Sequence, residues 1–215
     1  MIKGLIFDLD GTTLNTLEDL SDAVNRTMLH FGFPQRSIDE VRQKVGKGSK
    51  KLMEDTVPED TDPNRIPEIL EYYISAYGEN YADKTVPYEG IRDLLHSLQL
   101  KGIRLAINSN KPDHLTKGLI ERNFPEIDFV AVYGSMQDMP HKPDPAGANA
   151  ILEHMHLSKE EVLYVGDSET DMLTASNAGL KSIACLWGFR SKEVLEEAGA
   201  DYIAEKPEDI WSMIQ

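Results

Sequence analysis

Short apolar runs bounded by polar residues recur along this chain, and each run predicts a buried strand of a parallel sheet. The predicted strands cover residues 5–7, 103–107, 129–133, 162–165 and 181–186. From residue 91 onward, apolar residues around these runs recur every three or four positions, which is the spacing of an amphipathic helix. The predicted helices cover residues 91–98, 112–123, 145–156 and 168–178, and short elements cover 192–198, 201–204 and 207–214. Strands that alternate with helices in this way predict βαβ units with right-handed crossovers, and therefore an α/β fold.

The stretch between the first two predicted strands has a different pattern. Helical periods cover residues 17–31, 38–45, 49–56 and 66–81, with no convincing strand among them. Gly32 and Pro34 end the first of these helices. We therefore predict an all-helical domain over residues 15–85, inserted into a core made of residues 1–14 and 86–215.

The first strand ends in the sequence Asp8-Leu9-Asp10-Gly11-Thr12. Positions two apart in extended backbone point the same way, so Asp8 and Asp10 are expected to project together from the carboxyl end of the strand, where ligands bind in open α/β sheets. Two facing carboxylates repel each other unless a cation or a shared proton relieves them. Gly11 permits a tight turn that can aim backbone amides and the Thr12 hydroxyl at an anion. The stretch indicates a metal-assisted site for a phosphorylated ligand; the alternative is a strand followed by an ordinary Asp/Gly turn.

Polar residues also follow the later strands. Ser109 and Asn110 can offer a hydroxyl and an amide to a phosphate, and Lys142, set among prolines, can neutralise phosphate charge and hold a carboxylate. Asp167 and Asp171 can hold a hard divalent cation, directly or through its waters. Each has a structural alternative, namely a polar loop, a solvated lysine or a helix cap. Their shared placement at predicted strand ends favours the functional interpretation.

Composition excludes several partners. A formal net charge of −15 argues against nucleic acid and against an anionic membrane surface. The single cysteine, Cys185, excludes an internal disulfide and fits a reducing compartment, and its apolar surroundings in the sequence predict a buried structural thiol. No signal peptide precedes the first strand and no apolar run is long enough to span a bilayer, so the predicted location is the cytoplasm.

Taken in order, these motifs resemble those of the haloacid dehalogenase-like hydrolase superfamily, over essentially the whole chain. The matching stretches are Asp8-x-Asp10-Gly11-Thr12, Ser109-Asn110, Lys142 and Gly166-Asp167-Ser168-x-x-Asp171. The helical insert resembles the helical cap of that superfamily. The resemblance implies a Rossmann-like, doubly wound parallel sheet with an inserted all-α cap domain.

The resemblance also implies roles for the motif residues. Asp8 would be the nucleophile that accepts the phosphoryl group, and Asp10 would protonate the leaving oxygen and then activate water. An acid/base at that position favours phosphate transfer over dehalogenation. Mg²⁺ would be held by Asp8, the backbone carbonyl of Asp10 and Asp167, with Asp171 assisting. The implied phosphate-binding residues are Gly11, Thr12, Ser109, Asn110 and Lys142.

Softer features resemble phosphoglycolate phosphatases, among them Asn110-Lys111-Pro112 and Trp187-Gly188-x-Arg190-Ser191. They predict a Mg²⁺-dependent phosphatase for a small phosphorylated metabolite, with 2-phosphoglycolate as the leading candidate, acting as a monomer or homodimer. The alternatives are a β-phosphoglucomutase-like phosphomutase, a pyrophosphatase, a phosphonate hydrolase and a non-catalytic phospholigand-binding protein.

Positive charge gathers in the predicted cap, around two glycines. The residues are Arg42, Lys44, Lys47, Lys50 and Lys51, beside Gly46 and Gly48. One hypothesis is that this loop closes over the core and that Lys47 and Lys50 pair with the non-reacting end of an anionic substrate. The alternative is a solvated helix face, because lysine is rarely buried.

Overall fold

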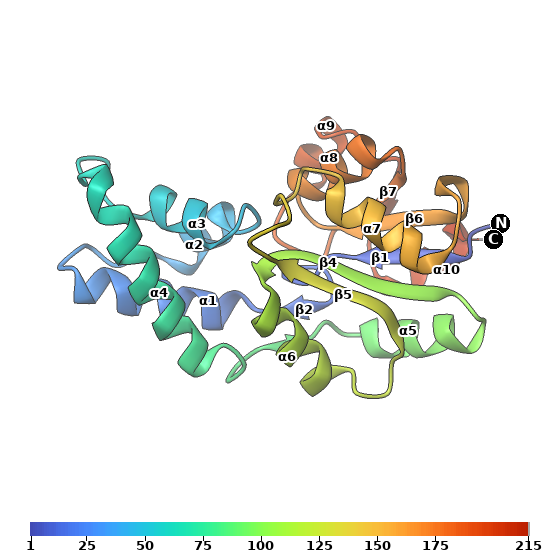
Figure 1. Ribbon diagram of the computed structural model, residues 1–215, viewed down its shortest axis with the longest axis horizontal. Coiled ribbons are helices and arrows are strands. Elements are labelled where there is room, and N and C mark those ends of the chain that lie inside the picture. Colours follow the sequence, from blue (N-terminus) through green and yellow to red (C-terminus); the bar gives the residue numbers. More distant parts are fainter. Residues whose placement is uncertain (215) are drawn as a thin grey trace.

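The computed structural model describes residues 1–214, and its core is a six-stranded parallel sheet with the order β5-β4-β1-β6-β7-β8 (Figure 1). The strands are β1 (Gly4–Phe7), β4 (Arg104–Pro112), β5 (Phe129–Ser135), β6 (Val162–Gly166), β7 (Lys181–Cys185) and β8 (Tyr202–Ala204). The chain proceeds outward from β1 to β5 and then returns to the other side of β1 to form β6, β7 and β8. This order confirms the doubly wound α/β prediction, and it places the ligand crevice at the carboxyl ends of β1 and β6.

Helices cover both faces of this sheet because alternate residues of each strand point to opposite sides. Leu5 and Phe7 pack with α5, α6 and α10, whereas Ile6 packs on the other face with α7 and α8. The core helices are α5 (Ile91–Leu100), α6 (Asp113–Asn123), α7 (Ala146–Met155), α8 (Glu169–Ala178), α9 (Lys192–Glu197) and α10 (Ile210–Met213), with short 3₁₀ turns η2 (Lys159–Glu161) and η3 (Pro207–Asp209). With both faces covered, β1 is buried along its whole length.

The predicted helical cap is present and forms the left-hand lobe of Figure 1. Its elements are α1 (Leu17–His30), α2 (Ile38–Lys44), α3 (Ser49–Thr56), η1 (Pro63–Arg65) and α4 (Ile66–Asn80). Apolar stripes of these helices meet in a cluster that includes Val24, Met28, Ile69 and Tyr73. None of the helices within residues 1–214 is both long and apolar enough to cross a membrane.

A two-stranded ribbon joins the cap to the core. Strands β2 (Leu14–Asn15) and β3 (Val86–Pro87) pair antiparallel, so the chain leaves and re-enters the core side by side. The sequence pattern did not predict this pair, because two residues are too few to show a period. The predicted domain boundary at residues 14/15 falls within β2 and that at 85/86 lies just before β3, and both remain predictions.

Strand β4 continues five residues beyond the predicted end at residue 107. Residues 108–111 are polar and therefore resemble a loop in the sequence, yet all of them are buried. Their polar groups find partners elsewhere in the core; for example, Asn108 Nδ2 donates to Tyr164 Oη at 3.2 Å. The extension holds the residues that follow Ile107 on a strand rather than on a mobile loop.

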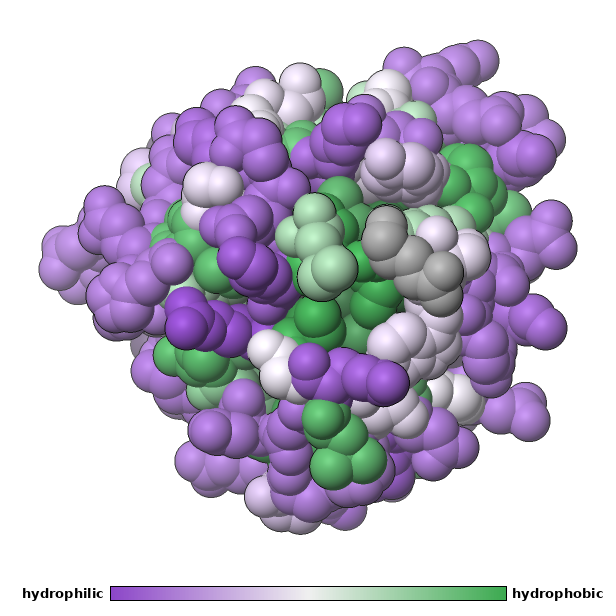
Figure 2. All heavy atoms as spheres, turned by 90° about the vertical axis from the view of Figure 1, so that its right-hand side faces the viewer, coloured by the Kyte–Doolittle hydropathy of each residue, from purple (hydrophilic) through white to green (hydrophobic). Residues whose placement is uncertain are grey.

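Figure 2 shows the end of the core where the N-terminus lies, with hydrophobic side chains gathered in the middle of a mostly hydrophilic face. The carboxyl ends of the strands, and the cap, lie at the opposite end of the molecule (Figure 1). The polar strand-end residues therefore face the cap.

Candidate active site

Three carboxylates meet at the carboxyl ends of β1 and β6. These strands pair in register from Gly4–Val162 to Phe7–Val165, so Asp8 and Asp167 emerge from neighbouring strands. Asp171 joins them from the first turn of α8. Oxygen atoms of these three carboxylates all lie within 4.8 Å of one another, and all three residues are buried.

Lys142 is the cation closest to this cluster within the described residues. Its Nζ lies 2.8 Å from Asp8 Oδ1 and 2.6 Å from Asp171 Oδ1, and its side chain is 4% exposed. One ammonium group does not neutralise three buried carboxylates. Burial, reinforced by Asp171 and opposed by Lys142, raises the pKa of Asp8 to about 7. Burial, with Asp171 and Asp8 nearby, likewise raises the pKa of Asp167 well above its usual range.

The cluster fits a hard divalent cation. Asp8 Oδ1 is buried and, although Lys142 lies beside it, makes no hydrogen bond of proper geometry. A cation bound by Asp8 and Asp167 would supply the missing positive charge, and an all-oxygen donor set suits Mg²⁺.

Asp167 is held in place by residues from two other segments. Thr12 Oγ1 donates to Asp167 Oδ1 at 2.9 Å, and the Phe189 backbone amide donates to Asp167 Oδ2 at 2.8 Å. Gly11 has φ of +90°, and a Cβ atom there would lie 2.3 Å from Asp167 Oδ2. The predicted phosphate-binding pair Gly11 and Thr12 therefore supports a carboxylate in this structure, and phosphate contact by either residue stays a prediction.

Asp171 has two sets of partners. Its Oδ2 accepts hydrogen bonds from the Ser168 amide and hydroxyl, at 3.1 and 2.6 Å, which completes a capping box at the start of α8. Its Oδ1 accepts from Lys142. Asp171 therefore caps α8, as the structural alternative predicted, and also holds Lys142, while its part in metal binding stays a prediction.

The Asp10 carboxylate lies in a different setting from Asp8, although both residues line one cavity. Asp10 Oδ1 accepts from Thr16 Oγ1 at 2.6 Å and from Lys111 Nζ at 2.8 Å, and Oδ2 lies 3.1 Å from the same Nζ. Asp10 is not part of the three-carboxylate cluster. Its expected acid/base role and its expected metal contact through the backbone carbonyl both stay predictions.

Asn110 ties three segments together. Its Nδ2 donates to the carbonyl of Lys142 at 3.0 Å and to that of Gly46 in the cap at 3.1 Å, while its Oδ1 accepts from the Lys142 amide at 2.8 Å. Ser109 lines the same cavity as Asp8, Asp10 and Lys142. The structure thus brings the predicted phosphate-binding residues Ser109, Asn110 and Lys142 together, and phosphate binding itself remains a prediction.

The cavity lies between core and cap and has a volume of about 40 Å³. Its cap wall is formed by the loop around Gly46 and by side chains of α1, α3 and α4, namely Leu20, Val45, Gly48, Ser49, Leu52, Tyr73 and Tyr77. The cap therefore lies over the reacting groups of the core.

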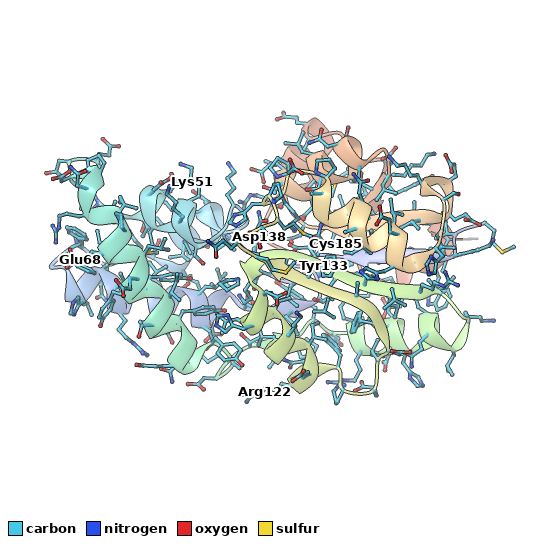
Figure 3. All side chains as sticks on the ribbon, in the orientation of Figure 1. Lys51, Glu68, Arg122, Tyr133, Asp138 and Cys185 are labelled. Atoms are coloured by element: carbon cyan, nitrogen blue, oxygen red, sulfur yellow. The ribbon has the colours of Figure 1, made fainter. Side chains whose placement is uncertain are left out.

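The cap lysines do not line this cavity. Lys47 and Lys50 are exposed, and Lys50 Nζ lies 3.8 Å from Glu54. Lys51, labelled on α3 in Figure 3, is also exposed and pairs with Asp55 at 2.5 Å. In this conformation the side chains of Lys47 and Lys50 are solvated, and their predicted contact with substrate stays untested.

Two residues that the sequence analysis did not assign reach the interface between core and cap. Lys111 contacts Asp10, as described above. Arg190 donates from its two terminal nitrogens to three carbonyls around the end of α2, those of Arg42, Gln43 and Val45, at 2.8 to 3.1 Å. Its Nε lies 2.8 Å from Glu169 Oε2. The sequence signals for Lys111 were its position after a strand beside other polar residues and its place in the stretch Asn110-Lys111-Pro112.

Comparisons with known proteins agree with this geometry. The profile of a family described as haloacid dehalogenase-like hydrolase matches residues 5–185. A phosphoglycolate phosphatase from Pseudomonas fluorescens is 30% identical over 90% of this chain and 73% of its own length. A phosphoglycolate phosphatase from Vibrio cholerae is 30% identical over 100% of this chain and 96% of its own length. The crystal structure of a protein from Lactobacillus delbrueckii subsp. bulgaricus superposes with a TM-score of 0.93 at 29% identity, covering 99% of this chain and 98% of that one.

Proposed function

The chain belongs to the haloacid dehalogenase-like hydrolase family and is a phosphatase, and from this premise we propose that it is Mg²⁺-dependent and forms an aspartyl-phosphate intermediate on Asp8. The leading substrate that we propose is 2-phosphoglycolate. The observation that carries the mechanism is the Asp8 carboxylate, which is buried beside Asp167 and Lys142 with one oxygen lacking a hydrogen bond.

The cation would be held by Asp8 and Asp167, with the Asp10 backbone carbonyl as a further ligand. When bound, it offsets the repulsion between the anionic nucleophile and the anionic phosphate. Lys142 also reduces this repulsion, because its ammonium group forms an ion pair with the Asp8 carboxylate.

In the first step a carboxylate oxygen of Asp8 attacks phosphorus and the bond to the ester oxygen breaks. The Asp10 carboxyl gives its proton to that leaving oxygen. In the second step the Asp10 carboxylate takes a proton from water, whose oxygen attacks phosphorus, and orthophosphate leaves as the Asp8 carboxylate is restored. The two steps need one carboxylate that attacks phosphorus and a second carboxylate that carries the proton. Asp8, which pairs with Lys142, and Asp10, which pairs with Lys111, have different surroundings, in agreement with these two roles.

Two observations support a small substrate. The relatives at 30% identity are named phosphoglycolate phosphatases. The cavity also lies between core and cap, so the whole ligand has to fit between these two parts of the protein. We further propose that the protein works in the cytoplasm, since Cys185, labelled in Figure 3, is a free and buried thiol.

The test is phosphate release from a panel of phosphorylated metabolites with Mg²⁺, using the wild-type protein and Asp8→Asn. The panel holds 2-phosphoglycolate, pyrophosphate, sugar phosphates and nucleoside monophosphates. Release from 2-phosphoglycolate that the variant lacks supports both mechanism and substrate. Asp8-dependent release from other esters only would move the substrate to another class, and release that persists in Asp8→Asn would overturn the mechanism.

A further inference from the structure

We propose that Lys111 selects the substrate by binding a carboxylate of the leaving group close to the ester oxygen. This inference rests on the proposed function, because it assigns the second anionic group of a small phosphorylated acid. Lys111 would then bind the non-reacting end of the substrate, a role predicted from the sequence for Lys47 and Lys50 in the cap.

Lys111 is placed in the wall of the active-site cavity at the end of β4, and its side chain is 2% exposed. Lys142 is the other cation among the described residues that line this cavity, and it is already shared by Asp8 and Asp171. Lys111 pairs with one carboxylate, that of Asp10, so it is the cavity cation better able to accept a second negative group.

The position of Lys111 relative to Asp10 specifies where that group must lie. Lys111 Nζ is 2.8 and 3.1 Å from the two Asp10 oxygens. As the proposed acid, Asp10 must come within about 3 Å of the ester oxygen. The Lys111 ammonium, which contacts Asp10, would therefore lie beside the leaving group and not beside the phosphoryl group that Asp8 accepts. A carboxylate one carbon from the ester oxygen falls within reach of Nζ, so the preferred substrate is the phosphate ester of an α-hydroxy acid.

The cap supports Lys111 from the other side. Nζ lies 4.7 Å from the centroid of the Tyr77 ring, whose π face attracts a cation. Tyr77 also lines the cavity, and its hydroxyl is buried without a hydrogen-bond partner. An anionic group that enters the cavity can accept from Lys111, and the ring keeps the ammonium in the site while it turns from Asp10 to the substrate.

The experiment compares kcat/KM for 2-phosphoglycolate with that for 2-hydroxyethyl phosphate, which is similar in size but carries an uncharged hydroxymethyl group in place of the carboxylate. A hydrogen bond to a charged group is worth about 1.5–3 kcal/mol, so we expect the wild-type protein to prefer 2-phosphoglycolate by roughly 10- to 100-fold. In Lys111→Met we expect this preference to fall to within about threefold, while Lys111→Arg, which keeps a cation, retains most of it.

Lys117→Met is the matched control, because Lys117 is an exposed lysine on α6 that pairs with Asp113 outside the cavity. It should keep the wild-type preference. Thermal unfolding of Lys111→Met, with and without orthophosphate, shows whether the variant is folded and still binds phosphate.

An equal loss of kcat/KM for both esters in Lys111→Met would overturn the inference, since Lys111 would then serve Asp10 alone. A wild-type protein that hydrolyses other esters through Asp8 but shows no preference for the carboxylate would also overturn it, while leaving the phosphatase mechanism in place. Absence of Asp8-dependent release from every ester would remove both proposals.

Discussion

Asp8 and Lys142 form a buried ion pair, with 2.8 Å between Asp8 Oδ1 and Lys142 Nζ, beside Asp171 at the start of α8. The two residues come from segments far apart in the sequence, and their side chains are 7% and 4% exposed. Breaking a buried pair on one side leaves an uncompensated charge, so this contact couples stability and activity.

Lys142→Met tests that coupling. We expect kcat to fall by about 10²–10³, the usual loss when one electrostatic contact to the reacting groups is removed. We also expect a free energy of unfolding lower by about 2–4 kcal/mol at pH 8, where Asp8 and Asp171 would face each other without the ammonium. Steady-state kinetics and urea unfolding measure the two effects. Lys181→Met, at an exposed lysine that begins β7, should change neither; a fully active Lys142→Met would contradict the assignment.

The raised pKa of Asp8 predicts how stability depends on pH in the absence of metal. Burial raises this pKa from 3.8 to about 7, so between these values the folded protein holds a proton that the unfolded chain has lost. Stability from this group is therefore fully present below pH 4 and is lost as pH rises towards 7, by at most about 1.4 kcal/mol per pH unit. Unfolding in EDTA from pH 5 to 8 should show the decline, and Asp8→Asn should show a smaller one. An identical slope in the two proteins would contradict the prediction.

Metal binding should reverse that trend. Mg²⁺ requires the ionised carboxylates of Asp8 and Asp167, so its affinity should rise with pH over the range in which Asp8 loses its proton. We expect the Mg²⁺-induced increase in Tm to be larger at pH 8 than at pH 5. Calorimetric titration in two buffers of different ionisation enthalpy should also detect proton release on binding. A shift in Tm that is equal at both pH values would speak against Asp8 as a ligand.

Gly11→Ala separates backbone strain from damage to the site. Gly11 has φ of +90°, and the added Cβ would lie 2.3 Å from Asp167 Oδ2, so Asp167 must move. We expect a loss of more than about 2 kcal/mol in stability together with weaker Mg²⁺ binding. Gly102→Ala is the control, because Gly102 has φ of +74° but nothing within 4 Å of the added Cβ. It should cost about 1 kcal/mol and leave Mg²⁺ affinity unchanged; equal Mg²⁺ affinity in both variants would show that Gly11 serves the turn alone.

The sequence predicted two kinds of element well: helices that are buried on one face, and strands that are buried on both faces. Helices with a clear apolar stripe, such as α1 over Leu17–His30, were predicted to within one residue. The buried run of β1 and its abrupt end at Asp8 located the site, because parallel strands bring their carboxyl ends to one edge. Asp8, Asp167 and Asp171 were therefore expected together and are found together.

The remainder depended on contacts between residues distant in sequence. Residues 108–111 look like a loop because they are polar, yet they lie in β4, where Asn108 is paired with Tyr164 from another strand. The pair of Asp10 with Lys111 spans 101 positions, so no local pattern encodes it. The Thr12 hydroxyl was assigned to a phosphate, but it contacts Asp167 on the neighbouring strand-end segment.

The cap lysines provide a direct test between two hypotheses for substrate choice. Because Lys47 and Lys50 are exposed and outside the cavity, we expect a Lys47→Ala, Lys50→Ala double variant to change KM for 2-phosphoglycolate by less than about threefold, through long-range charge alone. The change should disappear at 0.5 M salt, where exposed charges are screened. A salt-independent rise in KM of tenfold or more would instead favour the sequence-based hypothesis that these lysines contact the substrate in a further closed state.

Arg190→Ala tests whether the closed cap is held from the core. The Arg190 guanidinium donates to carbonyls at the end of α2, including those of Arg42 and Val45, where the helix dipole favours a cation. Removing it should favour the open cap, so we expect kcat/KM to fall by about 10- to 100-fold. Amide exchange in α2 and in the loop around Gly46 should become faster, while exchange in β1 and β6 stays slow. Arg26→Ala is the control, because Arg26 joins α1 to α4 within the cap. Faster exchange in α2 after Arg26→Ala, but not after Arg190→Ala, would show that cap stability, rather than the contact from the core, controls closure.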